Sequence, residues 1–320
     1  MIKMYILKTI FVLSLSMFFH FSLFSQVAVV GFADGGAYIG KPEFPEHTTT
    51  TFPSNLQLEK LTHVIAADIG CRNNGSLFTG KLPDFWQGTP PPDNVWNDSK
   101  NEWLENLVNR AHAKGVNASI SVGGDYFIDA TGSTYINAFV GNIVNFVDVH
   151  GFDGVNINWE YPSDTTEWNQ CIALLDLLKD NLPSTKRLTI ALSHATHVYD
   201  SFAFVPPQIL SIVDGIYLMT YDEGDDAWAS HSDVEKSIDA INEWISWQTP
   251  TCTQKKKLFL GSAFYGWHTA GNDSIRIPYR DYILNNDTRW NSNPGDLTLD
   301  ARNKAIHTRD NGFGGVFIWE

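Results

Sequence analysis

Short apolar runs alternate with longer amphipathic stretches from residue 27 to the end of the chain. The runs are rich in Val, Ile and aromatic residues, which is typical of strands buried on both faces. They predict eight strands, at 27–32, 62–68, 117–122, 153–159, 187–193, 214–220, 257–263 and 314–319.

The stretches between these runs have the periodicity of helices that bury one face. The apolar positions that recur at helical spacing are Ile136, Phe139, Val140, Ile143 and Val147, then Trp168, Ile172, Leu175 and Leu178, then Val234, Ile238, Ile241 and Ile245. Two S-x-x-E sequences predict helix starts, Ser99 to Glu102 and Ser232 to Glu235. In such a capping box the Ser side chain accepts a hydrogen bond from a free backbone N–H of the first turn, and the Glu side chain accepts one from the backbone N–H of the Ser.

Strand and helix repeated eight times in one domain predict a closed parallel (β/α)8 TIM barrel. The alternative is a doubly wound open sheet, but GFADGG at 31–36 lacks the G-x-G-x-x-G phosphate turn typical of that fold. The chain stops at Glu320, directly after the eighth predicted strand. We therefore expect the last helix to be missing and the C-terminus to be truncated; the alternative is that another segment covers the eighth strand.

The N-terminus has the order of a secretory signal. Lys3 and Lys8 precede an apolar run over 9–23, and small polar residues follow at Ser25 and Gln26. The run is shorter than the roughly 18 to 20 residues that span a membrane. We expect a signal peptide at 1–25, a mature domain at 27–320, secretion to the extracellular or periplasmic space, and no membrane attachment after cleavage; the alternative is a retained anchor.

Composition narrows the choice of partner. The net charge is −14 and no Lys/Arg cluster of the kind that binds a polyanion is present, which disfavours nucleic-acid binding. The 11 Trp favour a surface that stacks on sugar rings. The three Cys are far apart, so at most one disulfide is expected, and Cys171 is predicted to be a core residue on a helix.

The fourth predicted strand, DGVNINWE at 153–160, departs from the apolar pattern. Side chains alternate along a strand, so Val155, Ile157 and Trp159 share one face. The other face carries Asn156, Asn158 and Glu160, which places a carboxyl at the end of the barrel where catalysis occurs. A buried carboxyl has a raised pKa and acts as a general acid. The alternative is an exposed Glu in a loop above two structural amides.

Several motifs along the chain resemble glycoside hydrolase family 18. DGVNINWEYP at 153–162 resembles the family signature D-G-x-D-x-D-x-E, and ISVGG at 120–124, LMTYD at 218–222, FYG at 264–266 and GGVFIWE at 314–320 agree in order and spacing. The family includes chitinases, endo-β-N-acetylglucosaminidases and chitinase-like lectins. The resemblance implies that 27–320 is a catalytic domain of this family.

The resemblance implies a retaining, substrate-assisted hydrolysis of β-1,4 N-acetylglucosamine linkages. Glu160 matches the acid, and Tyr221 and Asp222 match the pair that supports the substrate's acetamido group. Asn158 stands where the family has the assisting Asp, so slower hydrolysis is expected. The rival hypothesis is a catalytically weak or inactive lectin with the same site.

Further residues carry over from the family pattern. Those expected to bind substrate are Phe32, Asn156, Tyr161, Met219, Trp228, Tyr265 and Trp319, and those expected to form structural motifs are Asp153, Gly154, Ser121, Gly123 and Gly124. For each aromatic residue the alternative is ordinary packing, with Phe32 the strongest case.

The expected ligand is a polysaccharide or oligosaccharide containing N-acetylglucosamine, with chitin and the N-glycan core both open. The interval from Tyr265 to Gly314 is too short for an α+β insertion, so we expect a shallow, open cleft. We expect a monomer without cofactor or metal: His194-x-x-His197 lacks a third ligand, and the acidic run from Asp222 to Asp226 lacks calcium-loop spacing.

Overall fold

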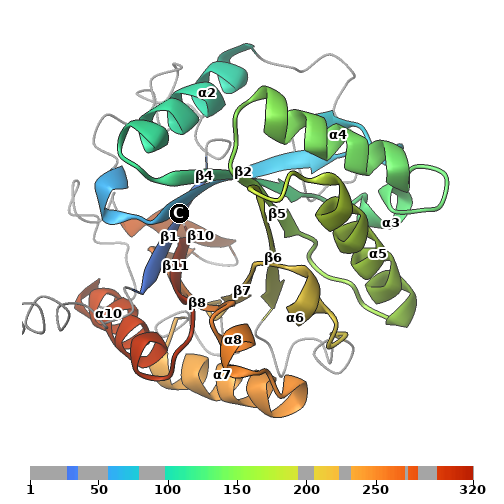
Figure 1. The fold of residues 1–320 in the computed structure, drawn as a ribbon. Coiled ribbons are helices and arrows are strands. Elements are labelled where there is room, and N and C mark those ends of the chain that lie inside the picture. The colour runs from blue at the N-terminus through green and yellow to red at the C-terminus, as the bar shows by residue number, and fades with distance from the viewer. Residues whose placement is uncertain are drawn as a thin grey trace, which may run out of the picture.

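The computed structural model describes residues 27–34, 57–78, 98–193, 205–222, 232–270, 273–279 and 294–319. Eight parallel strands form its centre: β1 (Ala28–Asp34), β2 (His63–Cys71), β4 (Asn117–Gly123), β5 (Gly154–Asn158), β6 (Arg187–Ser193), β7 (Gly215–Met219), β8 (Leu258–Ala263) and β11 (Gly315–Trp319). Because β1 pairs with both β2 and β11, the sheet closes on itself (Figure 1). The predicted barrel is confirmed, and closure excludes the doubly wound sheet.

Helices surround the barrel on its outer side (Figure 1). The long helices are α2 (Asp98–Ala113), α4 (Ile136–Val149), α5 (Thr165–Asn181), α7 (Val234–Gln248) and α10 (Pro294–Asp310). The shorter helices are η2 (Leu58–Lys60), α3 (Phe127–Ala130), α6 (Ile209–Ile212) and α8 (Cys252–Lys255).

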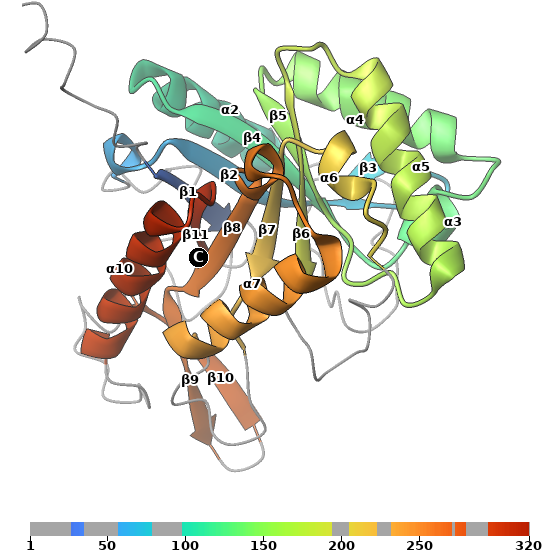
Figure 2. The same ribbon diagram turned by 60° about the horizontal axis from the view of Figure 1, so that its bottom comes forward.

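Three short strands were not predicted. β3 (Leu77–Phe78) pairs antiparallel with the end of β2, and β9 (Tyr265–Ala270) pairs with β10 (Asp273–Pro278) in a hairpin. The hairpin projects away from the barrel (Figure 2). Within the described part of the interval from Tyr265 to Gly314, the elements are this hairpin and α10.

The two faces of β5 separate as the alternation predicts. Val155, Ile157 and Trp159 belong to the core between barrel and helices, where Trp159 stacks on Phe127 with ring centroids 5.1 Å apart. A second, smaller core fills the barrel interior. Four of its aromatic members lie on β1, β7, β8 and β11: Phe32, Tyr217, Phe259 and Phe317.

The helix periodicity is confirmed for α4 and α5, whose buried residues include Phe139, Ile143, Leu175 and Leu178. In α7 the buried stripe is centred one position earlier than predicted. It consists of Ser237, Ala240, Ile241, Trp244 and Gln248, with the other predicted positions half-buried at its edges.

The predicted cap at Ser232 is wrong. α7 begins at Val234, and the carboxylate of Asp233 accepts the hydrogen bond from Lys236 N at 3.0 Å. The hydroxyl of Ser232 is buried instead, and accepts from Ala263 N at 3.2 Å and Lys304 Nζ at 2.9 Å. A side chain committed to a neighbouring strand and helix cannot also cap. α2 begins at Asp98, which places Ser99 inside that helix.

All three cysteines are free, with Cys71 and Cys171 buried and Cys252 exposed. The predicted core position of Cys171 on α5 is confirmed. Among the described residues, no helix is long and apolar enough to cross a membrane.

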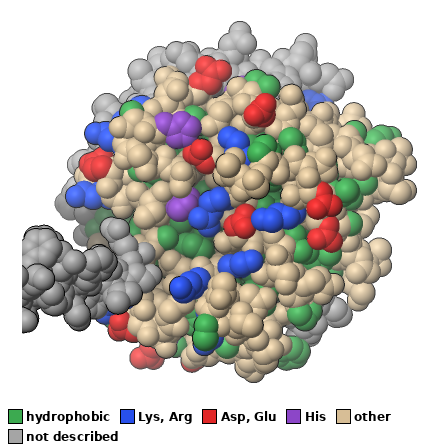
Figure 3. Space-filling view, viewed as in Figure 1, with side chains coloured by type: hydrophobic (Ala, Val, Ile, Leu, Met, Phe, Trp, Pro, Cys, Tyr) green, Lys and Arg blue, Asp and Glu red, His purple; other side chains and the backbone are tan. Residues whose placement is uncertain are grey.

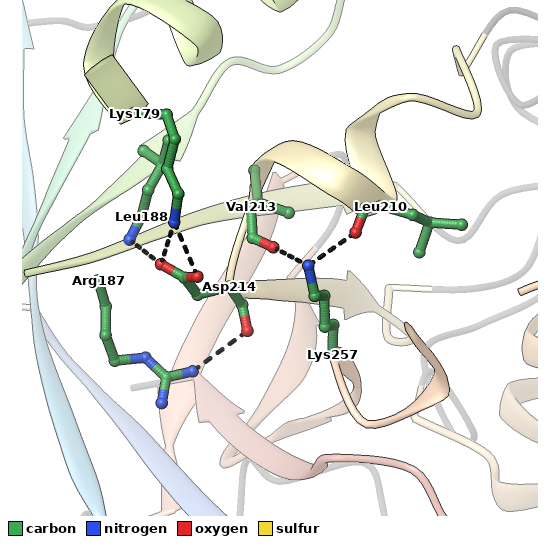
Figure 4. Close-up of polar contacts among 7 residues, drawn as sticks. All are labelled: Lys179, Arg187, Leu188, Leu210, Val213, Asp214 and Lys257. Atoms are coloured by element: carbon green, nitrogen blue, oxygen red, sulfur yellow. Dashed lines mark hydrogen bonds and ion pairs between the residues drawn. The ribbon is translucent and has the colours of Figure 1, made fainter. Parts of the chain in front are cut away.

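Polar contacts join the N-terminal ends of β6, β7 and β8 (Figure 4). Asp214 accepts from Lys179 Nζ and from Leu188 N, both at 3.0 Å, and Lys257 Nζ donates to the carbonyls of Leu210 and Val213 at 2.7 Å. Figure 3 shows basic, acidic and histidine side chains close together near the centre of the face seen in Figure 1. The bonds of Asp214 link α5 to the start of β6, and those of Lys257 link the start of β8 to the segment before β7.

Candidate functional site

The polar face of β5 carries Asn156 and Asn158, and Glu160 follows them. Asn156 comes first, and its side chain is fully buried inside the barrel. Its Nδ2 donates to Ser121 Oγ at 3.1 Å, and its Oδ1 accepts from Thr189 Oγ1 at 3.1 Å. Both ends of the amide are therefore committed to the neighbouring strands β4 and β6. Asn156, which we had expected to bind substrate, holds these strands together.

Asn158 lies one step nearer the C-terminal end of β5 and is 8% exposed. Its Nδ2 donates to Asp68 Oδ2 at 3.3 Å, and its side chain also hydrogen-bonds Glu160. Its Oδ1 is buried and accepts no hydrogen bond from the described residues. A buried acceptor without a donor costs about 1–3 kcal/mol, so a ligand N–H at this oxygen is favoured.

Glu160 projects from the chain beyond the last residue of β5. Its side chain keeps a surface that solvent reaches, since β5 ends two residues earlier at Asn158. Protein atoms nevertheless surround the carboxyl from several sides, and this burial raises its pKa. Hydrogen bonds from Asn158 and Tyr161 oppose the rise, and the negative charge of Asp222 adds to it. The outcome is a raised pKa on a group that solvent and ligands can reach.

Asp222 follows β7 and comes close enough to Glu160 to influence its charge. Its backbone is left-handed, with φ of 60°. Its Oδ2 accepts from the hydroxyl of Tyr265 at 2.5 Å. Tyr265 is fully buried, so it positions Asp222 and does not offer a ring to the opening that we had expected it to line.

Tyr161 lies beside the acid and is half-buried. Burial raises the pKa of its hydroxyl, and the neighbouring charge of Glu160 raises it further. The phenol therefore stays protonated and hydrogen-bonds Glu160, while Ser193 on β6 is its second partner.

An aromatic group lies at the end of β11. Trp319 is half-buried, and its ring centroid is 5.3 Å from that of Phe32. Phe32 is 5% exposed and also packs on Tyr217 and Phe317. The packing alternative for Phe32 is therefore favoured, and Trp319 keeps the surface that a sugar ring would contact. Met219 and Tyr221 belong to the same apolar cluster as Phe32, and they are 9% and 8% exposed.

Three of the motif residues, Gly154, Gly124 and Asp153, have structural roles. Gly154 lies where a Cβ atom would be 2.4 Å from the carbonyl oxygen of Arg187, and Gly124 has φ of +119°. Asp153 lies at the other end of β5 and accepts from Ala118 N and His112 Nε2, both at 2.8 Å.

Several predicted residues lie outside the described part of the chain: Trp228, His194, His197, the acidic residues 223–226, Glu320 and the signal segment 1–25. The described residues contain no group of three or more His, Cys, Asp or Glu placed to hold a metal ion.

Sequence reasoning missed Asp68 on β2. The signal was a lone carboxyl within the apolar run VIAADIG at 64–70. A charged residue in a strand buried on both faces requires partners, and the amide of Asn158 is one of them.

Comparison with known proteins assigns most of the chain to the family that its motifs resemble. The sequence profile of Glycosyl hydrolases family 18 matches residues 37–320. Chitinase 1 of Aphanocladium album is 24% identical over 264 residues, a match that covers 71% of this chain and 60% of the relative. The chain thus spans about 60% of that relative's length.

Two solved structures have a similar fold. A chitinase from Bacteroides thetaiotaomicron gives a TM-score of 0.70 at 19% identity, covering 92% of this chain and 90% of that chain. A chitinase-like agglutinin from Robinia pseudoacacia gives 0.67 at 17% identity, covering 91% and 94%. The profile match covers β5 and β7 and the residues Asn158, Glu160, Tyr221 and Asp222 at their ends, and the chain belongs to glycosyl hydrolases family 18.

Proposed function

We propose that this protein hydrolyses β-1,4 linkages of N-acetylglucosamine in chitin, chito-oligosaccharides or the N-glycan core, with Glu160 as the general acid. The observation that carries the proposal is the accessible carboxyl of Glu160, with its raised pKa, next to Asn158, Tyr161 and Asp222. Family membership and the similarity to Chitinase 1 support the choice of substrate.

The reaction proceeds in two steps. Glu160 gives its proton to the glycosidic oxygen as the acetamido carbonyl oxygen of the same sugar attacks the anomeric carbon, which breaks the C–O bond and forms an oxazolinium ion. The leaving sugar departs as an alcohol. Water then attacks the anomeric carbon and gives its proton to the Glu160 carboxylate, which restores the acid and the acetamido group with net retention.

We assign the acetamido N–H to Asn158 Oδ1, an assignment supported by the absence of any other donor to this oxygen among the described residues. An amide oxygen orients the group, but it carries no negative charge against the oxazolinium ion. Charge-assisted hydrogen bonds exceed neutral ones by about 1–2 kcal/mol, which corresponds to about five- to thirtyfold in rate. The proposed enzyme is therefore slow compared with one that has a carboxylate at this position.

The remaining residues orient the sugar. We assign Asp222, held by Tyr265, and Tyr221 to the acetamido group, and Met219 and Trp319 to the apolar faces of the ring. We assign Tyr161 to the acid itself, through its hydrogen bond to Glu160. The apolar run at 9–23 supports export, and we propose a secreted protein.

A lectin is the second candidate, and a specific observation favours it. Both interior positions of β5 below the acid are amides, and Asn156 is bonded at both ends within the protein. Such a site binds N-acetylglucosamine through the same hydrogen bonds without stabilising a cation.

The test compares wild type with Glu160→Gln on a chromogenic chito-oligosaccharide. We expect hydrolysis by wild type, and a loss of at least about a hundredfold in kcat in the variant, because a general acid contributes roughly 10²–10⁴-fold. Binding of tetra-N-acetylchitotetraose by calorimetry serves as the control for folding and should survive. Equal turnover in both proteins would refute the enzyme proposal, and binding without turnover in both would establish the lectin.

A further inference from the structure

We propose that Asp68 on β2 is a positioning residue of this site: it fixes the direction of the Asn158 amide and supplies the negative charge that β5 itself lacks. The inference rests on the proposed function and extends it to a residue on a different strand. Three independent features of the structure support it.

The first feature is the contact between the two side chains. Asp68 Oδ2 accepts from Asn158 Nδ2 at 3.3 Å, and Asn158 is 8% exposed. An ionised carboxylate only accepts hydrogen bonds, so it requires the nitrogen of the amide on its side. A rotated amide would bring two oxygens together, whereas the observed direction turns Oδ1 away from Asp68.

The second feature is an irregularity in β2 at this position. In the pairing of β2 with β4, Ala66 is opposite Ile120 and Ile69 is opposite Val122, so β2 carries one extra residue between these pairs. A β-bulge of this kind re-aims a side chain. Ala66 and Ile69 both belong to the outer core, and Ala67 belongs to the interior core.

The bulge changes the face on which Asp68 lies. In a regular strand, Asp68 would share the outer face with Ala66, among the apolar side chains under the helices. Because of the extra residue, Asp68 instead contacts Asn158 of the interior face, and Ile69 takes the outer position.

The third feature is the space at Gly123 on β4. A Cβ atom there would lie 3.1 Å from both Cγ and Oδ2 of Asp68, closer than side chains normally pack. Any larger residue at position 123 would therefore press on the carboxylate that faces Asn158. The glycine of the ISVGG segment leaves this volume to the carboxyl group.

Together these contacts give Asp68 two effects on Asn158. The carboxylate holds Nδ2, which leaves Oδ1 as the acceptor for an acetamido N–H. It also places a negative charge behind the amide, which polarises Nδ2–H and makes Oδ1 a stronger acceptor. The pair Asp68–Asn158 thus holds one carboxylate and one amide, with the carboxylate on β2.

The experiment measures both binding and turnover in Asp68→Asn. We expect the affinity for tetra-N-acetylchitotetraose to fall about three- to tenfold, because the amide direction is no longer fixed. We expect kcat to fall by about a further tenfold, because the charge near the oxazolinium ion is lost. Asp176→Asn, an exposed substitution of the same kind on α5, is the matched control and should leave both unchanged.

The exchange of the two groups separates positioning from mere packing. Asp68→Asn with Asn158→Asp restores one carboxylate and one amide, and should recover kcat at least to the wild-type value. Asn158→Asp alone places two carboxylates in contact, where repulsion keeps one of them protonated. It should therefore gain less than the double variant, a coupling that a double-mutant cycle measures.

Each outcome decides between the two proposals. If Asp68→Asn binds and turns over like wild type, or if the double variant shows no recovery, the role of Asp68 is refuted while hydrolysis stands. If wild type binds without turnover, hydrolysis fails and the affinity comparison still tests Asp68. If wild type neither binds nor turns over, both proposals fail. Thermal unfolding of each variant identifies any loss that comes from folding alone.

Discussion

At the scale of single residues, the proton of Glu160 controls the proposed chemistry. A general acid works only while protonated, so activity is present below its pKa and is lost as the pH rises through it. Burial raises the pKa of Glu160, and the charge of Asp222 raises it further. The basic limb of the pH profile should therefore lie at higher pH than for a fully solvated glutamate.

Asp222→Asn tests this origin of the pKa. Removal of a negative charge stabilises ionised Glu160, so its pKa falls and the basic limb of kcat/KM moves to lower pH. The measurement is the pH dependence of kcat/KM for both proteins, with Asp129→Asn on the exposed side of α3 as control. A limb that stays in place, or moves to higher pH, would contradict the assignment.

At the scale of elements, β5 and β6 approach so closely that only glycine fits at one position. A Cβ at Gly154 would lie 2.4 Å from the carbonyl oxygen of Arg187, and backbone cannot move aside as a flexible side chain does. We expect Gly154→Ala to destabilise the protein by about 3 kcal/mol, because overpacking strains a closed sheet. Denaturant unfolding measures this change.

Gly141 provides the matched control in α4. A Cβ there would meet nothing within 4 Å, and the residue is in the middle of the helix. Gly141→Ala should stabilise the protein by about 0.5–1 kcal/mol, because Ala has the higher helix propensity. Equal effects of the two substitutions would show that the close approach at Gly154 does not limit stability.

At the scale of the whole molecule, the neutral state of His63 at the N-terminal end of the barrel links stability to pH. Burial, with a smaller contribution from the nearby charge of Arg187, lowers the pKa of His63 from 6.5 to about 4. Its Nε2 lies 3.2 Å from Arg187 Nη1 and 3.3 Å from Asn117 Nδ2, so the neutral ring accepts hydrogen bonds there.

Stability should therefore depend on pH through His63. Between pH 6.5 and about 4 the unfolded chain binds the proton and the folded chain does not, so stability falls as the pH drops through this window. His63→Gln keeps an acceptor but does not titrate, and it should lose part of this fall in thermal midpoint. A variant with the wild-type pH dependence would show that His63 does not control it.

Much of the molecule follows from local sequence. The structure confirms the eight strand positions, the buried stripes of α4 and α5, and the two faces of β5. These features are predictable because a buried strand or helix face requires apolar residues at regular spacing in the sequence. The cap of α7 was misassigned, because Ser232 and Asp233 are equally suited to capping and a contact with Ala263 decides between them.

The sequence alone determined a closed (β/α)8 barrel with Glu160 at the end of its fourth repeat, because periodicity and motif order are local properties. It also determined that amides replace carboxylates at 156 and 158. Only the tertiary structure decided that Asn156 is committed within the barrel, that Tyr265 holds Asp222, and that Asp68 meets Asn158. The physical reason is that these contacts cross from strand to strand: a bulge on β2 and a missing Cβ on β4 bring together groups that are 90 positions apart in the chain.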